Sequence, residues 1–145
     1  MPFSFINTVA SWMLKKRIHE IELFIKYPVD VQNEELKKLL NTAKNTEFGK
    51  KYEFSSINDY KTFKERVPSF TYEEFFPIIN KTIKGEQNIF WPEKIKWFAQ
   101  SSGTTNSKSK FLPVSNSSLD DCHFKGGKDM LCFYLNNNEN SNMFL

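Results

Sequence analysis

The chain has few of the residues from which covalent cross-links and metal sites are built. Its 145 residues include 2 cysteines, Cys122 and Cys132, and 2 histidines, His19 and His123. There is no Cys-x-x-Cys pair and the histidines lie far apart in the sequence, so we expect no metal site. On one predicted helix the cysteines would lie about 15 Å apart along its axis, too far for a disulfide. This predicts buried thiols in a reducing compartment.

Long hydrophobic runs are also lacking, and none approaches the length needed to span a bilayer. Residues 3–14 are fairly apolar, but the basic residues 15–17 follow them. A secretory signal has the opposite order, with its positive charge before the apolar run. We therefore expect a cytoplasmic protein with no membrane span. A weak membrane-surface helix is the alternative for this segment.

An excess of charge of one sign is absent as well. The sequence has 20 basic and 17 acidic residues, which gives a net charge of +3. Nucleic-acid binding usually requires a clustered basic face, so we expect no nucleic-acid partner; only the basic pI and many aromatic residues favour one. The 15 phenylalanines and 3 tryptophans supply apolar area for a core. Length, with no internal repeat or dividing linker, predicts a single domain.

Apolar residues recur at helical spacing over most of the chain. We expect one helix over residues 4–26, ended by Pro28, and a second that begins at Asp30 or Asn33 and stops at Gly49. The apolar stripe of the first helix favours packing into a core. Binding of a partner is the alternative, in which the partner covers aromatic residues of this helix, Phe3, Phe5 and Trp12, that the chain itself does not cover.

Two further helices are predicted before residue 86. Thr71 and Glu74 have the spacing of a capping box, which opens a helix that Gly85 ends. Pro77 lies inside that helix, so we expect a kink or a break near Phe76. The shorter helix before it is expected from Asn58 or Asp59 to Pro68.

The segment after residue 86 is predicted to change character. A loop with Phe90-Trp91-Pro92 packs into the core or lines a pocket, and it leads to two strands over residues 95–99 and 111–114. Ser115 caps a last helix, in which Gly126-Gly127 calls for a close packing partner. Its apolar stripe is expected at Leu119, Cys122, His123, Gly126, Met130 and Phe133-Tyr134. We expect His123 to be partly buried, with its hydrogen-bonding groups satisfied, rather than catalytic.

The segment between the two strands carries the strongest functional signal. Hydroxyl side chains can donate to phosphate oxygens, Gly103 allows a ligand to approach the backbone, and the lysines add charge. This segment is not a Walker A loop, because that loop continues into a helix and a predicted strand follows here. It is not a dinucleotide-binding fingerprint either, because the further glycines of that motif are missing. An ordinary solvated loop is the alternative. The candidate phosphate-binding residues are Ser101, Ser102, Gly103, Thr104, Thr105, Lys108 and Lys110, and no residue is assigned as catalytic.

The order Ser101-Ser102-Gly103-Thr104-Thr105, followed by Lys110 and Phe111-Leu112-Pro113, resembles the phosphate-binding motif of adenylate-forming enzymes. The most similar branch is the auxin-responsive-promoter family of acyl-acid amido synthetases, which share the firefly-luciferase-like architecture. Ser107 departs from that motif, because glycine is common at its position. Supporting similarities lie in residues 46–52, 67–73 and 121–127.

The resemblance implies an α+β fold, mostly helical here, with about five helices and a short β-hairpin that carries the phosphate loop. Residues 1–145 would form an incomplete N-terminal part of an adenylate-forming domain, because residues 143–145 look like the start of a strand without a partner. The parent protein would use ATP together with Mg²⁺, with AMP as product. It would join a carboxylic acid to an amino acid.

A different class of function stays open on the residues themselves. The chain could be a non-catalytic helical interaction module, in which the hydroxyl-rich loop is only a hairpin turn. If the chain is instead part of a ligase, the remainder of the parent chain would supply the rest of the nucleotide pocket. We therefore expect the fragment alone to be inactive.

Overall fold

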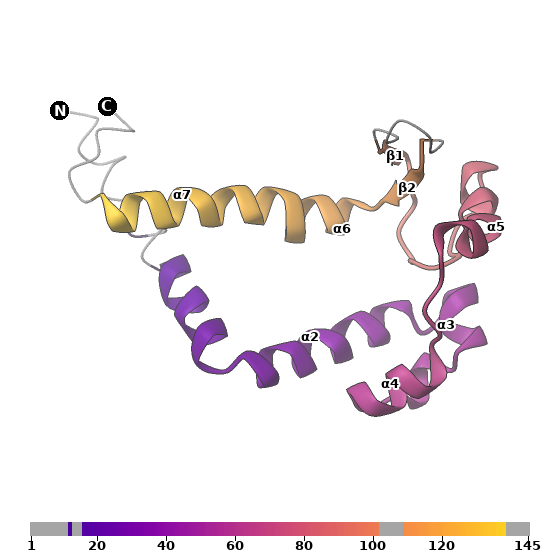
Figure 1. Cartoon of the computed structure of the whole chain (residues 1–145), viewed down its shortest axis with the longest axis horizontal. Coiled ribbons are helices and arrows are strands. Elements are labelled where there is room, and N and C mark those ends of the chain that lie inside the picture. Colours follow the sequence, from indigo (N-terminus) through magenta and orange to yellow (C-terminus); the bar gives the residue numbers. More distant parts are fainter. Residues whose placement is uncertain (1–11, 13–15, 102–108, 139–145) are drawn as a thin grey trace. The chain divides into compact units, whose positions relative to one another are not determined.

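The computed structural model describes residues 12, 16–101 and 109–138, which divide into two compact units. One unit is Met1–Val31 together with Asp120–Leu145, and the other is Gln32–Leu119. In the described residues the secondary structure is mostly helical, with one two-stranded antiparallel sheet (Figure 1). The predicted α+β class with a short hairpin is therefore confirmed. No helix in this part of the chain has the length and apolar character required to cross a membrane.

The first unit pairs a helix over residues 16–26 with α7 (Lys125–Asn137). Arg17 donates two hydrogen bonds to the carboxylate of Asp129, at 2.6 and 2.7 Å. These bonds raise the pKa of Arg17 and lower the pKa of Asp129, so both side chains stay charged. Each of these two helices also carries a buried side chain, Ile21 on the first and Cys132 on α7. The predicted first helix is confirmed where it is described and does end before Pro28.

The second helix, α2 (Pro28–Ala43), begins earlier and ends earlier than its sequence predicts. It starts at Pro28 rather than at Asp30 or Asn33, because proline has its φ preset for the first helical position and lacks only a donor that would be free there. Leu40 and Ala43 are buried along its inner face. The predicted stop at Gly49 is wrong.

Thr46 explains where α2 stops. Its hydroxyl donates to the carbonyl of Ala43 at 2.7 Å and accepts from the N–H of Gly49 at 2.9 Å. Thr46 is thus the N-cap of a new helix, α3 (Glu47–Lys51), and it is fully buried. Gly49 lies inside α3, where a Cβ would overlap the Ala43 carbonyl. The glycine serves close packing between two helix ends rather than helix termination.

An aromatic cluster forms around Phe48 on α3. Its ring is 5.7 Å from that of Phe75, and the ring of Phe90 lies 6.1 Å from that of Phe75. Main-chain hydrogen bonds from residues 47 and 48 to the carbonyls of Asn88 and Ile89 hold the Phe90 loop against α3. Phe90 therefore packs with the core aromatics. The other rings within 6.2 Å of Phe48 belong to Tyr52, Phe54 and Phe70.

Two capped helices follow the 3-10 turn η1 (Phe54–Ser56). Asp59 caps α4 (Tyr60–Arg66), as its position predicts. The predicted capping box opens α5 (Tyr72–Ile83), and Gly85, at φ 99°, ends it. Gly85 and Glu86 donate to the carbonyls of Thr82 and Lys81, which is the Schellman arrangement.

Of the kink or break predicted near Phe76, the break is wrong, because α5 continues through Pro77. The kink stays a prediction. Proline inside a helix removes one hydrogen bond and crowds the carbonyl four residues earlier. Packing on both sides of Pro77 compensates: Phe75 lies in the aromatic cluster and Ile79 is among the most deeply buried residues described. Tertiary burial outweighs the local preference of one residue.

The hairpin consists of β1 (Trp97–Gln100) and β2 (Phe111–Val114), with Trp97 opposite Val114 and Gln100 opposite Phe111. Both predicted strands are confirmed. Contacts between α5 and β2 place the helix beside the hairpin (Figure 1). Ser115 caps α6 (Asn116–Ser118), also as predicted.

The predicted inner face of the last helix is largely wrong. The π-helical segment η2 (Leu119–Phe124) separates α6 from α7, and its wider turn rotates the following residues relative to an ideal 3.6-residue period. Cys122, His123 and Met130 are exposed, whereas Cys132 is buried. The prediction of a buried thiol is therefore confirmed for Cys132 and wrong for Cys122. The prediction that His123 is partly buried is also wrong. Among the described atoms, nothing lies within 4 Å of a Cβ built on Gly126 or Gly127, so the expected packing partner is absent there.

The glycines allow a test with opposite signs. Gly49→Ala should destabilise the chain by about 1–3 kcal/mol, because the added methyl has no room beside the Ala43 carbonyl. Gly127→Ala is the matched control and should stabilise it by roughly 0.5–1 kcal/mol, because its site is open and helical. Urea denaturation of the three proteins measures both effects. Equal shifts in the same direction would contradict the packing role of Gly49.

The capping box should make stability depend on pH. The backbone hydrogen bond from Thr71 lowers the pKa of Glu74 below its ordinary value of 4.5. A depressed pKa in the folded state contributes stability above the unfolded pKa, and this contribution is lost as the pH falls through the folded pKa. At pH 7 we expect the unmodified protein to have a higher melting temperature than its Glu74→Gln variant. The difference between the two melting temperatures should close below pH 4.5. A gap that is constant from neutral to acid pH would refute this role.

Candidate functional site

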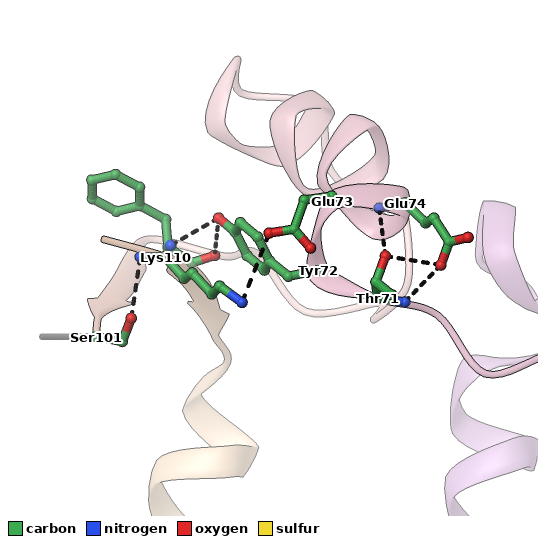
Figure 2. Close-up of polar contacts among 7 residues, drawn as sticks. Thr71, Tyr72, Glu73, Glu74, Ser101 and Lys110 are labelled. Atoms are coloured by element: carbon green, nitrogen blue, oxygen red, sulfur yellow. Dashed lines mark hydrogen bonds and ion pairs between the residues drawn. The ribbon is translucent and has the colours of Figure 1, made fainter. Parts of the chain in front are cut away.

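The candidate site is the open end of the hairpin, where the hydroxyl-rich segment leaves β1 and returns to β2. The N–H of Ser101 donates to the carbonyl of Lys110 at 3.0 Å. The N–H of Lys110 donates to the hydroxyl of Ser101 at 3.1 Å, in place of the carbonyl that would complete a regular pair. These reciprocal bonds close the base of the loop, and Figure 2 shows the one from Lys110 to the Ser101 hydroxyl.

Of the predicted phosphate-binding residues, Ser101 and Lys110 lie together at this base. The hydroxyl of Ser101 accepts a hydrogen bond there, and a serine hydroxyl that accepts can also donate its own proton to a ligand. The other candidates fall in 102–108, outside the described residues, so their phosphate contacts stay predictions. They are Ser102, Gly103, Thr104, Thr105 and Lys108.

The ammonium of Lys110 has two neighbours on α5. It lies 5.0 Å from the centroid of the Tyr72 ring, within the range of a cation–π contact. It also lies 3.9 Å from a carboxylate oxygen of Glu73. The lysine side chain is 42% exposed, so its charge is held near the loop and remains accessible. Figure 2 shows Lys110 extending toward both residues.

Tyr72 makes a second connection, to the main chain of the residue after Lys110. The N–H of Phe111 donates to the Tyr72 hydroxyl at 2.9 Å, and that hydroxyl donates to the Phe111 carbonyl at 3.4 Å. Because Ser101 and Lys110 form a hydrogen-bonded pair, the next pair along the ladder turns its N–H and C=O groups outward. Phe111 belongs to that next pair. Tyr72 therefore satisfies two main-chain groups that β1 does not reach.

The sequence contains a partial signal for Tyr72. The capping box predicts that it is the first residue of a helix, which its structure confirms. Nothing in the sequence links it to Phe111, which lies 39 positions away. Tyr72 and Glu73 are therefore site residues that sequence reasoning missed.

A second network fixes the far end of β2. The indole N–H of Trp91 donates to the Ser117 hydroxyl at 2.9 Å, and the N–H of Ser117 donates to Glu93 at 3.1 Å. The latter bond lowers the pKa of Glu93, so its carboxylate stays charged at the start of α6. Ser115 accepts from the N–H of Ser118 at 3.0 Å and completes the cap.

Two other chemically reactive side chains, His123 and Cys132, belong to the unit that contains α7. His123 is exposed and its ring lies 5.4 Å from that of Phe124. Burial raises the pKa of the Cys132 thiol, which makes it a poor nucleophile. Within the described residues, no group of three or more His, Cys, Asp and Glu side chains could hold a metal ion.

Known proteins resemble this chain over most of its length. The GH3 family N-terminal domain matches residues 17–143. An indole-3-acetic acid-amido synthetase of Arabidopsis thaliana, GH3.2, is 34% identical over 106 residues, which are 72% of this chain and 19% of that protein. A jasmonoyl–L-amino acid synthetase of Nicotiana attenuata, JAR6, is 33% identical over 103 residues, which are 70% of this chain and 18% of that protein.

The fold has a solved counterpart in the acyl acid amido synthetase AtGH3.15, whose structure is of a complex with 2,4-DB. The TM-score is 0.74 at 21% sequence identity, over 85% of this chain and 21% of that one. This chain thus spans about a fifth of the length of the relatives it matches. From its match over residues 17–143 and its relatives, the chain belongs to the GH3 family and carries the N-terminal region of that family's acyl acid amido synthetase fold.

Proposed function

We propose that this chain is the N-terminal part of an ATP-dependent ligase that adenylates a carboxylic acid and couples it to the amine of an amino acid. The relatives are named as synthetases that join acids to amino acids, which supports the acid and the amino acid as substrates. A cytoplasmic location and the lack of a nucleic-acid partner stay predictions from composition. The remainder of the parent chain would be the chief partner.

One structural observation supports phosphate binding more than any other. The hydroxyl-rich segment is closed at its base by Ser101 and Lys110, with the lysine ammonium accessible beside it. Ser101 and Lys110 are thus held in place by contacts within the chain itself. Groups held in advance stabilise charge more effectively than groups that must first reorient.

The chemistry would proceed in two steps. A carboxylate oxygen attacks the α-phosphorus of ATP, the bond to the bridging oxygen breaks, and pyrophosphate leaves with its charge. The product of this step is an acyl-adenylate. The amine then attacks its acyl carbon, AMP leaves, and an amide forms as the amine loses a proton. The loop would hold phosphate oxygens through Ser101, Ser102, Thr104 and Thr105. Gly103 would allow close approach, and Lys110, with Lys108 beside it in the sequence, would balance the charge.

Mg²⁺ fits this proposal as a companion of the nucleotide. Magnesium is usually bound by substrate phosphates, one or two carboxylates and water. The described residues offer no cluster of three metal ligands, so this part of the chain would leave most of the coordination to ATP. When bound, the ion would neutralise phosphate charge, a contribution additional to that of Lys110.

The combined substitution Thr104→Ala and Lys110→Ala tests the loop. Each charge-assisted hydrogen bond contributes roughly 1.5–3 kcal/mol, so acid-dependent exchange of pyrophosphate into ATP should fall at least about tenfold in the complete protein. Lys64→Ala on α4 removes an exposed lysine elsewhere and is the control. Exchange that is unaffected by the double substitution would disprove phosphate binding by this loop and favour the non-catalytic interaction module.

The 145-residue chain should bind ATP weakly or not at all when it is produced alone. Phosphate contacts without contacts to adenine and ribose leave most of a nucleotide's surface exposed, and binding must still offset lost translational freedom. Isothermal titration calorimetry of the chain with ATP and Mg²⁺ measures this. Micromolar affinity would contradict our view that the fragment is incomplete and inactive.

A further inference from the structure

The first turn of α5 touches Lys110 in two ways that the proposed function does not use. We propose that Tyr72 and Glu73 are positioning residues for this lysine. Tyr72 fixes the main chain of the next residue, Phe111, and places its ring beside the lysine ammonium, and Glu73 holds that ammonium until a nucleotide phosphate displaces the carboxylate. The inference rests on the proposed role of Lys110 in phosphate binding. It adds a device for keeping the loop's charge in place before the ligand arrives.

The main-chain part of the device is the clamp on Phe111. Its N–H and C=O both bond to the Tyr72 hydroxyl, at 2.9 and 3.4 Å, while Ser101 holds the N–H and C=O of Lys110 from the opposite side. Two consecutive residues are thus fixed by partners on both edges of β2. The main chain of Lys110 and Phe111 is therefore held from two sides.

The side-chain part of the device is the placement of the ammonium. It lies over the Tyr72 ring and 3.9 Å from Glu73, whose side chain is 74% exposed. An exposed ion pair at this distance is weak and is screened by salt. A triphosphate carries more charge than one carboxylate, so it would compete successfully for the lysine. Glu73 would then be a like charge near the ligand and would reduce its affinity.

The element that carries both residues is itself well anchored. The capping box fixes the first turn of α5, with Thr71 and Glu74 bonded in both directions at 2.8 and 3.2 Å (Figure 2). Phe75, in the same turn, packs with the aromatic cluster around Phe48. A rigid support of this kind is what a positioning residue needs, because small displacements of a catalytic charge are costly.

The clamp can be tested in this chain without any nucleotide. Tyr72→Phe keeps the ring and removes the hydroxyl, so amide hydrogen exchange at Phe111, followed by NMR, should be at least about tenfold faster. Tyr60→Phe on α4 removes an exposed tyrosine hydroxyl and is the control. Unchanged exchange at Phe111 in Tyr72→Phe would overturn the clamp.

The positioning role is tested by pyrophosphate exchange in the complete protein. Tyr72→Phe should raise the ATP concentration for half-maximal rate about fivefold, as expected for the loss of one hydrogen bond, with the maximal rate little changed. Glu73→Gln should lower that concentration about twofold, a gain that misfolding cannot mimic. Glu65→Gln, an exposed carboxylate on α4, should have no effect.

The outcomes separate this inference from the function on which it rests. If Lys110→Ala impairs exchange while Tyr72→Phe and Glu73→Gln both match the unmodified protein, the positioning role is wrong and phosphate binding stands. If Lys110→Ala leaves the kinetics unchanged, phosphate binding by Lys110 fails and the positioning role fails with it. Opposite shifts for Tyr72→Phe and Glu73→Gln, with Lys110→Ala impaired, would support both.

Discussion

The hydrogen bonds between the Tyr72 hydroxyl and the main chain of Phe111 are the interaction on which the position of the hairpin depends. A two-stranded hairpin is marginally stable by itself, and this one exposes Trp97 and Leu112 at 63% and 49%. Support has to come from a neighbouring element, and α5 provides it through β2. One phenol thereby ties a helix to a strand and fixes the exit of the loop.

The support continues from the hairpin back to the buried core. Tyr72 is followed within one turn by Phe75, whose ring lies 5.7 Å from Phe48 on α3. The start of α3 is fixed by Thr46, which is fully buried and has both sides of its hydroxyl satisfied. Glu47 and Lys81 form an ion pair at 2.6 Å that also joins α3 to α5. The loop base thus rests on a packed aromatic cluster through short, specific contacts.

Local signals in the sequence predicted much of this arrangement. The caps at Asp59, Thr71 and Ser115 and both strands were predicted, because each depends on residues within a few positions of one another. Side-chain caps satisfy helix-end N–H groups whatever lies further away. The pairing of Ser101 with Lys110 at the base of the loop was not predicted; the structure shows it.

The errors occurred where distant packing decides. Gly49 has the appearance of a helix stop, but it serves the approach of α3 to the Ala43 carbonyl. Pro77 has the appearance of a break, but burial of Ile79 and contacts of Phe75 keep the helix continuous. The inner face of the last helix was misplaced because a π-helical segment shifts the period, which no composition rule reveals. Tyr72 was missed because its partner is distant in sequence.

The way the loop is held bears on the one departure of this sequence from its family's motif. Ser107 stands where glycine is common, and a serine has fewer accessible backbone conformations. The fixed points of the loop lie elsewhere, at Ser101 before it and at Lys110 and Phe111 after it. None of these contacts involves Ser107, which lies outside the described residues. Lys110 keeps its position because Tyr72 and Glu73, rather than the loop itself, determine where its charge lies.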